Sequence, residues 1–494
     1  MVTSTTAADR YNASTLVDHN LAAGRGAKTA VSCGEESITY DELHRRICSA
    51  GAALGELGVD PGDRVLLVMD DCIDLPAVFL GAIRIGAIPV PVNPLYGSDE
   101  YGYFVSDSGA AVVVVDAACA EKVAAPVTVL ASDLRGVDDD LPPASTRADD
   151  AAFWLYSSGS TGRPKGVIHR QRDMLVTCET YAKHVLGIRE DDVTFSTTKL
   201  FHAYGLGNNL SFPHWAGASS VLLSGRPTPD AIDATVARHR PTIVFSVPTL
   251  YNALLHADTS NQDWSSVRTC VSAAEPLPAE VWHRWHERYG LEILDGIGST
   301  EMLHIYCSNR RGEVVPGSSG TPVPGYEVKL CDEEGRELLG ETTGDLYVRG
   351  DSMLAAYWNQ PDKTAVSIRN GWFYSRDRYR RDADGNYWYE GRADDMFKVS
   401  GLWVSPVDVE ARLIEHPAVV EAAVVGVPVE GLLKAKAFVV CEAADRDDER
   451  LADELRTFCA ERLHRYQVPH VIEFVDSLPK TLTGKILRYQ LREG

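Results

Sequence analysis

A short polar stretch in the first third of the chain could hold an anion. Residues 157–166 read SSGSTGRPKG and combine glycines with a lysine and hydroxyl groups, namely Lys165, Ser157, Ser158, Ser160 and Thr161. Hydroxyls, backbone N–H groups and an ammonium are the donors that a polyphosphate needs. The spacing is not that of a Walker A loop, which requires GxxxxGK followed by Ser or Thr. Alone, the stretch is equally compatible with a surface loop or a linker.

Five further segments place polar residues where they could complete such a site. They are SAAEPLP (272–278) with DGIGSTE (295–301), WFYSRDRY (372–379), EGRADDMFKVSG (390–401) and PKTLTGKILR (479–488). Each has a plain structural explanation when taken alone. Glu301 could be the acidic residue of a helix cap, Asp377 a solvated turn acid and Lys485 a surface charge.

The elements that must position these residues alternate between apolar strand-like runs and helical stretches. RVLLVMD (64–70) is typical of a buried strand, and the helical DLPAVFLGAIRIG (74–86) follows it. Later apolar runs such as TIVFSVP (242–248) continue the alternation. The apolar run AAFWLYS (151–157) leads into SSGSTGRPKG, which we expect to be a loop leaving a strand. The pattern predicts an α/β fold of layered subdomains with largely buried sheets.

The pattern of predicted strands and helices changes in the last third of the sequence. After Tyr326, hairpin-like runs around Gly and acidic turns predict a β-rich subdomain. From about Asp394 a compact α+β pattern begins, with the hairpin KVSGLWVS and an N-cap at Ser405-Pro406 before a helix. We therefore expect a large N-terminal domain over residues 1–393 and a small α+β C-terminal domain over residues 394–494.

Composition excludes several classes of protein. The chain of 494 residues carries a net charge of −22, so we expect no partnership with nucleic acid or with a membrane. It contains no apolar run of the ~18 residues that a span needs, and its first residues lack a secretory signal, which predicts a cytoplasmic protein. The 10 cysteines are scattered without CxxC pairs, so neither a metal site nor a disulfide framework is expected. A monomer and a homodimer are both compatible with the sequence.

In their order along the chain, the polar segments resemble the adenylate-forming superfamily of acyl-CoA ligases, nonribosomal adenylation domains and luciferases. The resemblance covers nearly the whole chain. WLYSSGSTGRPKGVIH, KLFHAYGLGNN, DGIGSTEMLHIY and DDMFKVSGLWVSPVDVE look closest to benzoate-type aryl-CoA ligases. The resemblance implies that an aromatic carboxylic acid reacts with ATP to give an aryl-AMP and pyrophosphate. The thiol of coenzyme A then takes the aromatic acyl group to form a thioester, and AMP is released.

The resemblance also implies roles for residues of the nucleotide site. Ser157, Ser158, Ser160, Thr161 and Lys165 would hold the β- and γ-phosphates. Thr300 would contact the α-phosphate and Glu301 would hold Mg²⁺, a hard cation suited to oxygen ligands. Asp377 would accept the ribose hydroxyls with help from Arg392. Adenine would lie between Ala274-Glu275 and Asp295-Gly296-Ile297.

This chain departs from the family pattern at three of these positions. Many relatives have Thr-Gly where Ser375-Arg376 stands, Gly in place of Ala274 and an aromatic ring in place of Ile297. Adenine packing at residue 297 must therefore be aliphatic.

The same resemblance assigns the C-terminal domain to catalysis. The ammonium of Lys485 would bridge the acid and AMP oxygens as two anions meet. Asp394 would be the hinge about which the domain rotates between the two half-reactions, although Asp394-Asp395 is also compatible with an exposed acidic linker. In the second state Lys398, Ser400 and Gly401 would line the tunnel for coenzyme A.

The acid itself would meet the segment FHAYGLGNN. His202, Ala203, Tyr204 and Gly205 would lie beside the aryl group, and His304 is a further candidate. Aromatic and small residues suit a flat ring better than a long flexible chain. His202 stands where some relatives have Phe, so it could hydrogen-bond a ring hydroxyl or act as a gate to the thiol tunnel. His169, Arg170 and Arg172 are expected to be surface cations.

Two other functions compete with an aryl-CoA ligase. An aryl-AMP ligase could load the phosphopantetheine of a separate carrier protein, because no carrier-like GxxS domain follows Lys485. A nucleotide-binding sensor or scaffold without catalysis is the alternative from another class. The argument against it is the presence of all the expected site residues Lys165, Thr300, Glu301, Asp377, Arg392 and Lys485.

Overall fold

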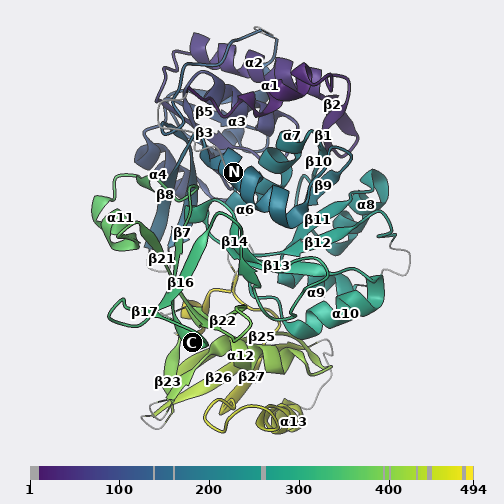
Figure 1. Cartoon of the computed structure of the whole chain (residues 1–494), viewed down its shortest axis with the longest axis vertical. Helices are drawn as coiled ribbons and strands as arrows, with labels where there is room; N and C mark the ends of the chain where they lie inside the picture. Colours follow the sequence, from purple (N-terminus) through teal and green to yellow (C-terminus); the bar gives the residue numbers. More distant parts are fainter. Residues whose placement is uncertain are drawn as a thin grey trace.

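The protein is described here from a computed structural model of the whole chain (Figure 1). The described residues are 10–136, 140–159, 162–257, 263–392, 395–399, 402–429, 432–441, 448–480 and 486–492. The molecule is elongated, with the N-terminal layers at one end and the C-terminal part at the other.

A parallel sheet, of strand order β4-β3-β5-β6, forms the first layer. Alternate residues of its strands face two different cores. Val65 and Leu67 join the core beneath helices α2 and α3, whereas Leu66 and Val68 join the core beneath α4. Burial on both faces explains why these strands are continuously apolar, as expected from the sequence. The elements are β3 (Arg64–Val68), β4 (Ile88–Val92), β5 (Val112–Val115), β6 (Thr128–Leu130), α2 (Tyr40–Glu56), α3 (Asp74–Arg84), α4 (Ser98–Ser108), η1 (Ala120–Lys122) and η2 (Ala131–Leu134).

A second sheet has the order β15-β14-β13-β12-β11-β9-β10-β1-β2, parallel from β13 to β1 and antiparallel at both ends. Its strands are β1 (Thr29–Cys33), β2 (Glu36–Thr39), β9 (Val193–Ser196), β10 (Ser219–Leu222), β11 (Ile243–Ser246), β12 (Thr269–Ser272), β13 (Ile293–Gly298), β14 (Ile305–Ser308) and β15 (Thr321–Pro322). The helices and helical turns of this region are α1 (Thr15–Ala22), α5 (Asp173–Thr177), η3 (Cys178–Leu186), α6 (Ala203–Leu206), η4 (Gly207–Ser211), α7 (Phe212–Ala216), α8 (Pro229–His239), α9 (Pro248–His256), α10 (Ala279–Tyr289) and η5 (Thr300–Met302).

The segment SSGSTGRPKG differs from the expected loop. It lies in a hairpin of β7 (Ala151–Gly159) and β8 (Gly162–Arg170), with Ser157 opposite Lys165 in the antiparallel register. Strand β19 (Ala356–Tyr357) pairs with the outer side of β8. The extended conformation places Ser157 and Lys165 on paired strands, and it brings Tyr357 beside them.

The expected β-rich subdomain is present. Its strand order is β17-β16-β18-β21-β20, and β22 pairs with β21. The elements are β16 (Glu327–Cys331), β17 (Glu337–Leu338), β18 (Thr342–Arg349), α11 (Pro361–Ser367), β20 (Ile368–Arg369), β21 (Trp372–Arg381) and β22 (Tyr387–Arg392).

The C-terminal part has a hydrophobic core of its own, which includes Phe397, Val409 and Val424. As expected, Ser405 caps the helix at Pro406, where its hydroxyl accepts the N–H of Asp408 at 3.3 Å. The elements are β23 (Phe397–Val399), β24 (Leu402–Val404), α12 (Pro406–Ile414), β25 (Val419–Val429), β26 (Leu432–Cys441), α13 (Asp448–Ala460), β27 (Val471–Phe474) and α14 (Arg488–Arg492). Ala393 and Asp394 lie outside the described residues, so the domain boundary remains a prediction.

The cysteines match the expectation from their scattered spacing. All 10 are free thiols, and most of them are buried. Among the helices that the structure describes, none combines the length and the apolar character of a membrane span.

Candidate functional site

Three polar side chains meet where the β7–β8 hairpin faces the end of β13. Lys165 Nζ lies 2.9 Å from Glu301 Oε1 and donates to Tyr357 Oη at 2.8 Å. Tyr357 donates to the same Glu301 oxygen at 2.8 Å, and Ser157 Oγ lies 3.4 Å from it. The alternative of Glu301 as a helix-cap residue is not observed, because its carboxylate is used by these contacts. Tyr357 was not expected here, since its sequence context carries no signal.

The contacts keep Glu301 ionised although it is buried. Burial alone would raise the pKa of Glu301, but the charge of Lys165 and hydrogen bonds from Lys165 and Tyr357 hold that pKa below its ordinary value. Burial and the neighbouring Glu301 raise the pKa of Tyr357, which therefore stays a neutral donor. The group presents a carboxylate oxygen and an ammonium side by side in a poorly solvated place.

The expectation for His169 was wrong, because this residue is fully buried. Its Nδ1 lies 2.9 Å from Asp173 Oδ2, and its Nε2 lies 2.8 Å from the carbonyl oxygen of Thr300. His169 thus ties the hairpin to the turn that carries Thr300 and Glu301. Alternation along β8 could have indicated this, since Val167 and His169 share a face. Arg170 is half-buried and donates to Met353 O at 3.0 Å, whereas Arg172 pairs with Asp149 at 2.7 Å.

A large cavity of about 1060 Å³ adjoins this group. The residues that line it come from parts of the chain that are far apart in the sequence. Many of the residues predicted for nucleotide binding line it, namely Ser157, Lys165, Ala274, Glu275, Gly296, Ile297, Thr300, Glu301, Asp377 and Arg392. Asp295 is not among the lining residues. It is 4% exposed, and burial raises its pKa well above the ordinary value.

A β-bulge in β21 presents the predicted ribose-binding acid. Between the pairs Asp345–Arg378 and Tyr347–Tyr374, strand β21 has more residues than β18, and the extra ones are at Ser375-Arg376-Asp377. Arg392 Nη1, on the neighbouring β22, lies 3.4 Å from Asp377 Oδ1. The bulge therefore turns Asp377 and Arg376 toward the cavity.

Two of the departures from the family pattern have unusual backbone geometry. Arg376 has a φ of 64° and Ala274 a φ of 77°, in the left-handed region that glycine adopts freely. Glycine is the residue that the family resemblance leads us to expect at both positions. Non-glycine residues there cost about 1 kcal/mol or more each, and such strain concentrates at functional sites.

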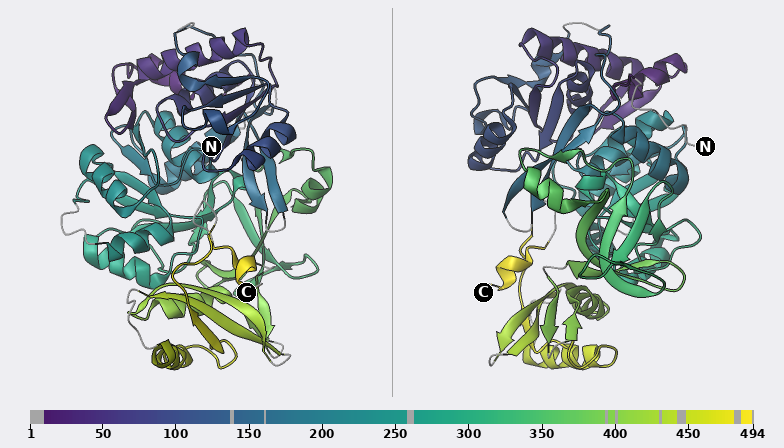
Figure 2. Two further views of the ribbon diagram at one scale, coloured as in Figure 1. Left: turned by 180° about the vertical axis from the view of Figure 1, so that it is seen from behind. Right: turned by 60° about the vertical axis from the view of Figure 1, so that its left-hand side comes forward.

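The C-terminal part closes the cavity from the other side. Residues on both sides of the 481–485 segment line it, including Lys480, Ile486 and Arg488. Lys480 forms an antiparallel bridge with Ile486, and Lys480 Nζ lies 2.7 Å from Glu421. Arg488 Nη2 lies 2.7 Å from the buried Glu410. In both views of Figure 2 the last helix, in yellow, lies at the junction between the C-terminal part and the rest of the molecule.

Several predicted site residues lie outside the described residues. They are Ser160, Thr161, Asp394, Ser400, Gly401 and Lys485. The backbone of Ser158 is described as part of β7, but its side chain is not. Lys398 is exposed on β23, with its Nζ 4.5 Å from the centre of the Trp403 ring, and it does not line the cavity.

Among the residues predicted for the acid, His304 is 2% exposed. Its Nε2 lies 3.0 Å from Asn208 Oδ1, and the rings of Tyr181, Tyr204 and Phe212 surround it with centroids 4.6 to 5.5 Å away. Burial lowers the pKa of His304 to about 3, so the imidazole is neutral. A side chain at Gly207 would place its Cβ 2.4 Å from this ring, which explains the need for glycine there.

His202 precedes the same helical turn. Burial lowers the pKa of His202 to about 4, and its ring packs on Phe201 with centroids 4.5 Å apart. Ala203 is buried, and a Cβ at Gly205 would lie 2.1 Å from the carbonyl oxygen of Lys199. His202, Ala203, Tyr204, Gly205 and His304 do not line the large cavity. Of these residues, Tyr204 packs beside His304, with ring centroids 5.5 Å apart.

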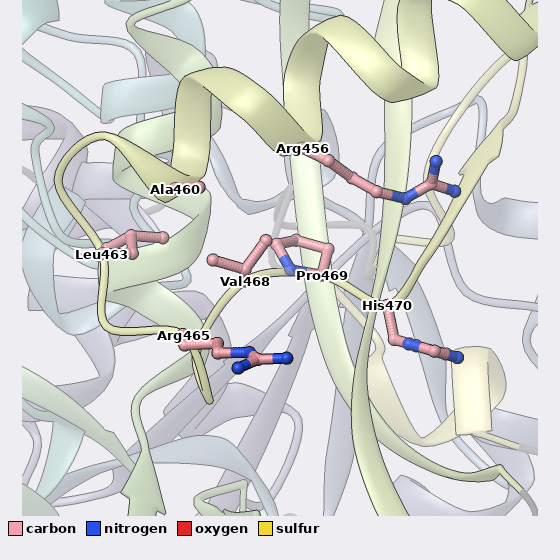
Figure 3. A pocket seen from close by; sticks show the side chains of 7 residues that line it. All are labelled: Arg456, Ala460, Leu463, Arg465, Val468, Pro469 and His470. Carbon is pink, nitrogen blue, oxygen red and sulfur yellow. The ribbon is translucent and has the colours of Figure 1, made fainter.

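A smaller cavity of about 530 Å³ lies on the C-terminal part (Figure 3). Arg456 of α13 lines it, together with Arg465 and His470 from the segment before β27 and apolar residues that include Leu463 and Pro469. None of the residues predicted for the site lines this cavity.

Known proteins match this chain over nearly its whole length. The sequence profile of the AMP-binding enzyme family matches residues 19–358, and that of the AMP-binding enzyme C-terminal domain matches residues 408–485. A benzoate–CoA ligase of Thauera aromatica is 47% identical, over 98% of this chain and 96% of that protein.

Solved structures agree in fold. The anthranilate CoA ligase AuaEII in complex with anthranoyl-AMP has a TM-score of 0.94 and 39% identity, covering 98% of this chain and 97% of that one. A benzoate CoA ligase from Burkholderia xenovorans LB400 has a TM-score of 0.91 and 44% identity, covering 98% and 99%. With profile matches to both of its parts and close relatives along its full length, the chain belongs to the family of AMP-binding enzymes.

Proposed function

We propose that the protein is an ATP-dependent, AMP-forming aryl-CoA ligase that acts on benzoate or a hydroxybenzoate. One observation of the structure carries the proposal. Ser157 and Lys165, which are expected to bind phosphates, line the same cavity as Asp377 and Arg392, which are expected to bind the ribose. Lys480 and Ile486, on either side of the 481–485 segment, line it as well. This arrangement suits a nucleotide that reacts at its α-phosphate between the two parts of the chain.

In the first half-reaction a carboxylate oxygen attacks the α-phosphorus of ATP, and pyrophosphate leaves. Ser157 and Lys165 bind the departing phosphates, and the Lys165 ammonium offsets their charge. Thr300 contacts the α-phosphate from a turn that His169 holds in place. Lys485 stabilises the charge that builds where the two anions meet. In the second half-reaction the thiolate of coenzyme A attacks the aryl carbonyl carbon, and AMP leaves.

Glu301 fits the role of a Mg²⁺ ligand. It is an ionised carboxylate at the edge of the cavity, and Mg²⁺ is commonly bound by one or two carboxylates together with substrate phosphates. The cation would neutralise charge on the phosphate oxygens. In the part of the chain that is described, no cluster of three or more His, Cys, Asp or Glu side chains could hold a metal ion alone. The site therefore depends on the nucleotide to supply the remaining ligands.

The alternative of loading a carrier protein is not favoured. The relatives that match this chain from end to end at 39 to 47% identity are CoA ligases. The sensor without catalysis is also not supported, because the charged residues of the cavity are present and ordered around it.

We further propose that residues 394–494 rotate as a unit about Asp394 between the half-reactions. Exchange of Asp394 for proline would restrict the backbone at that point. We expect Asp394→Pro to form aryl-AMP at a rate within about 2-fold of the wild type but to slow thioester formation by roughly 10- to 100-fold. Single-turnover assays of each half-reaction measure this, and unchanged thioester formation would contradict the hinge.

The function itself is tested by a screen of carboxylic acids for pyrophosphate release with and without coenzyme A. Benzoate and hydroxybenzoates should release pyrophosphate and give the CoA thioester. Pyrophosphate without a thioester would favour a carrier protein as acceptor. No pyrophosphate from any acid would overturn the proposal.

A further inference from the structure

Arg376 occupies a conformation that suits glycine, in a wall of the nucleotide cavity. Its φ of 64° lies in the left-handed region, within the bulge of β21. Ser375 fixes the bulge, because its hydroxyl donates to Leu346 O at 3.1 Å and accepts the N–H of Asp377 at 3.0 Å. The chain thus keeps a disfavoured residue at a well-defined position. Such an outlier points to a function for its side chain.

A second cation, Lys363, reaches the same wall from helix α11. The neighbouring Thr364 accepts the backbone N–H of Tyr357 at 3.0 Å, which places the helix against the Lys165–Glu301–Tyr357 group. Burial lowers the pKa of Lys363, and the charges of Lys165 and Arg376 lower it further. Lys363, Arg376 and Lys165 all line the cavity, and the charges of Arg376 and Lys165 both act on Lys363.

These two cations differ from the others at the site in having no counter-charge. Lys165 pairs with Glu301 and Arg392 pairs with Asp377. Neither Lys363 nor Arg376 takes part in an ion pair within the described ranges of the chain. Uncompensated positive charge is notable in a cavity of a protein whose net charge is −22. It favours an anionic ligand at this end of the cavity.

The position of the cations selects the part of the ligand that they contact. Ala274 and Ile297 line the cavity in segments predicted to hold adenine, whereas the charge of Arg376 acts on Tyr357 and the charge of Lys165 acts on Lys363. We propose that Lys363 and Arg376, together with Lys165, bind the β- and γ-phosphates of ATP and the pyrophosphate that leaves. This inference rests on the proposed function and adds two specific binding residues to it.

The test compares two nucleotides that differ in these phosphates. Binding of a non-hydrolysable β,γ-imido analogue of ATP and of AMP is measured by titration calorimetry with Mg²⁺ present. We expect Lys363→Gln and Arg376→Gly each to weaken binding of the analogue by roughly 5- to 10-fold. Both variants should bind AMP within about 2-fold of the wild type.

Matched controls separate a local contact from a general loss of charge. Lys183→Gln and Arg336→Gln each remove one positive charge from exposed sites, at side chains that are 50% and 74% exposed. They should leave binding of both nucleotides unchanged. Arg376→Gly should melt no lower than the wild type, because glycine adopts the left-handed backbone freely.

Two results would overturn the inference. One is unchanged binding of the analogue in both variants, and the other is an equal loss of AMP binding. Failure of the proposed function would look different, since the wild-type protein would then bind nucleotide without forming a CoA thioester from any aryl acid.

Discussion

The large cavity predicted to bind the nucleotide and the region around His304 lie close in the fold but differ in charge and in access to solvent. The cavity is open and charged, and its polar groups come from both parts of the chain. The His304 region is closed and neutral, with aromatic rings around a desolvated imidazole. Glu301 keeps its charge despite burial because Lys165 compensates it, whereas His304 has no such partner and loses its charge.

The difference indicates how the two halves of the reaction are specified. We expect charge and its placement to select the nucleotide, because phosphates are strong acceptors and carry most of the ligand's charge. We expect shape and a few neutral hydrogen-bonding groups to select the acid, because an aromatic ring offers little else. Variants on the nucleotide side should therefore alter rate, and variants on the acid side should alter preference.

The largest effect is expected for Lys485→Ala. Loss of the ammonium should slow aryl-AMP formation by roughly 100- to 1,000-fold, because it removes charge stabilisation needed only as the two anions meet. Thioester formation from supplied aryl-AMP should be spared. Separate assays of the two half-reactions measure this, and an equal loss in both would contradict the role of Lys485.

The next effect is expected for Glu301→Gln. An amide is a weaker acceptor than a carboxylate, so pyrophosphate release should fall by about 30-fold, equivalent to about 2 kcal/mol. The KM for the aryl acid should stay within about 2-fold if the two regions are independent. Glu313→Gln at an exposed position is the control. A parallel rise in the KM for the acid would show that the regions are coupled.

A pH-dependent effect on stability is expected from His304. Its pKa is about 3 in the folded protein and 6.5 ordinarily, so between these values the unfolded chain binds a proton that the folded chain does not. Stability therefore falls as the pH drops through this window. When the pH falls from 7.5 to 5, the free energy of unfolding should decrease in the wild type by about 2 kcal/mol more than in His304→Gln. Urea unfolding at the two pH values measures this difference. Identical losses would contradict a neutral, desolvated His304.

The smallest effect is expected for His202→Phe. This exchange should shift the ratio of kcat/KM for benzoate and hydroxybenzoates by roughly 10-fold toward the unsubstituted acid, because it removes a polar group near the predicted ring site. Rates of pyrophosphate release with saturating ATP measure the ratio. An unchanged preference would mean that His202 does not select the acid.

Much of the fold could be predicted from patterns along the chain. The buried parallel strands, the β-rich subdomain and the capped helix at Ser405-Pro406 are all present, because hydrophobic periodicity and capping are local signals. The hairpin at SSGSTGRPKG was not expected, since glycine and serine are typical of loops. The two sides of the segment are extended because β7 and β8 pair with each other, with Ser157 opposite Lys165.

The sequence predicted which residues belong to the candidate site better than it predicted the contacts between them. The Lys165–Glu301 pair joins residues that were each expected at the site, but Tyr357 comes from a third segment without a motif. His169 was misplaced because its partners, Asp173 and the Thr300 carbonyl, become neighbours only after folding. The left-handed backbone of Arg376 depends on the register of β18 and β21, which no local pattern shows.

The ion pairs at the ends of the 481–485 segment have a practical consequence. Lys480 is fastened to Glu421 and Arg488 to Glu410, so both ends of the segment belong mechanically to the C-terminal body. Any reorientation of the C-terminal part must therefore move Lys480 and Arg488 together with it. A spectroscopic label at the exposed Tyr489 would therefore report the orientation of the whole C-terminal part rather than local motion of the tail.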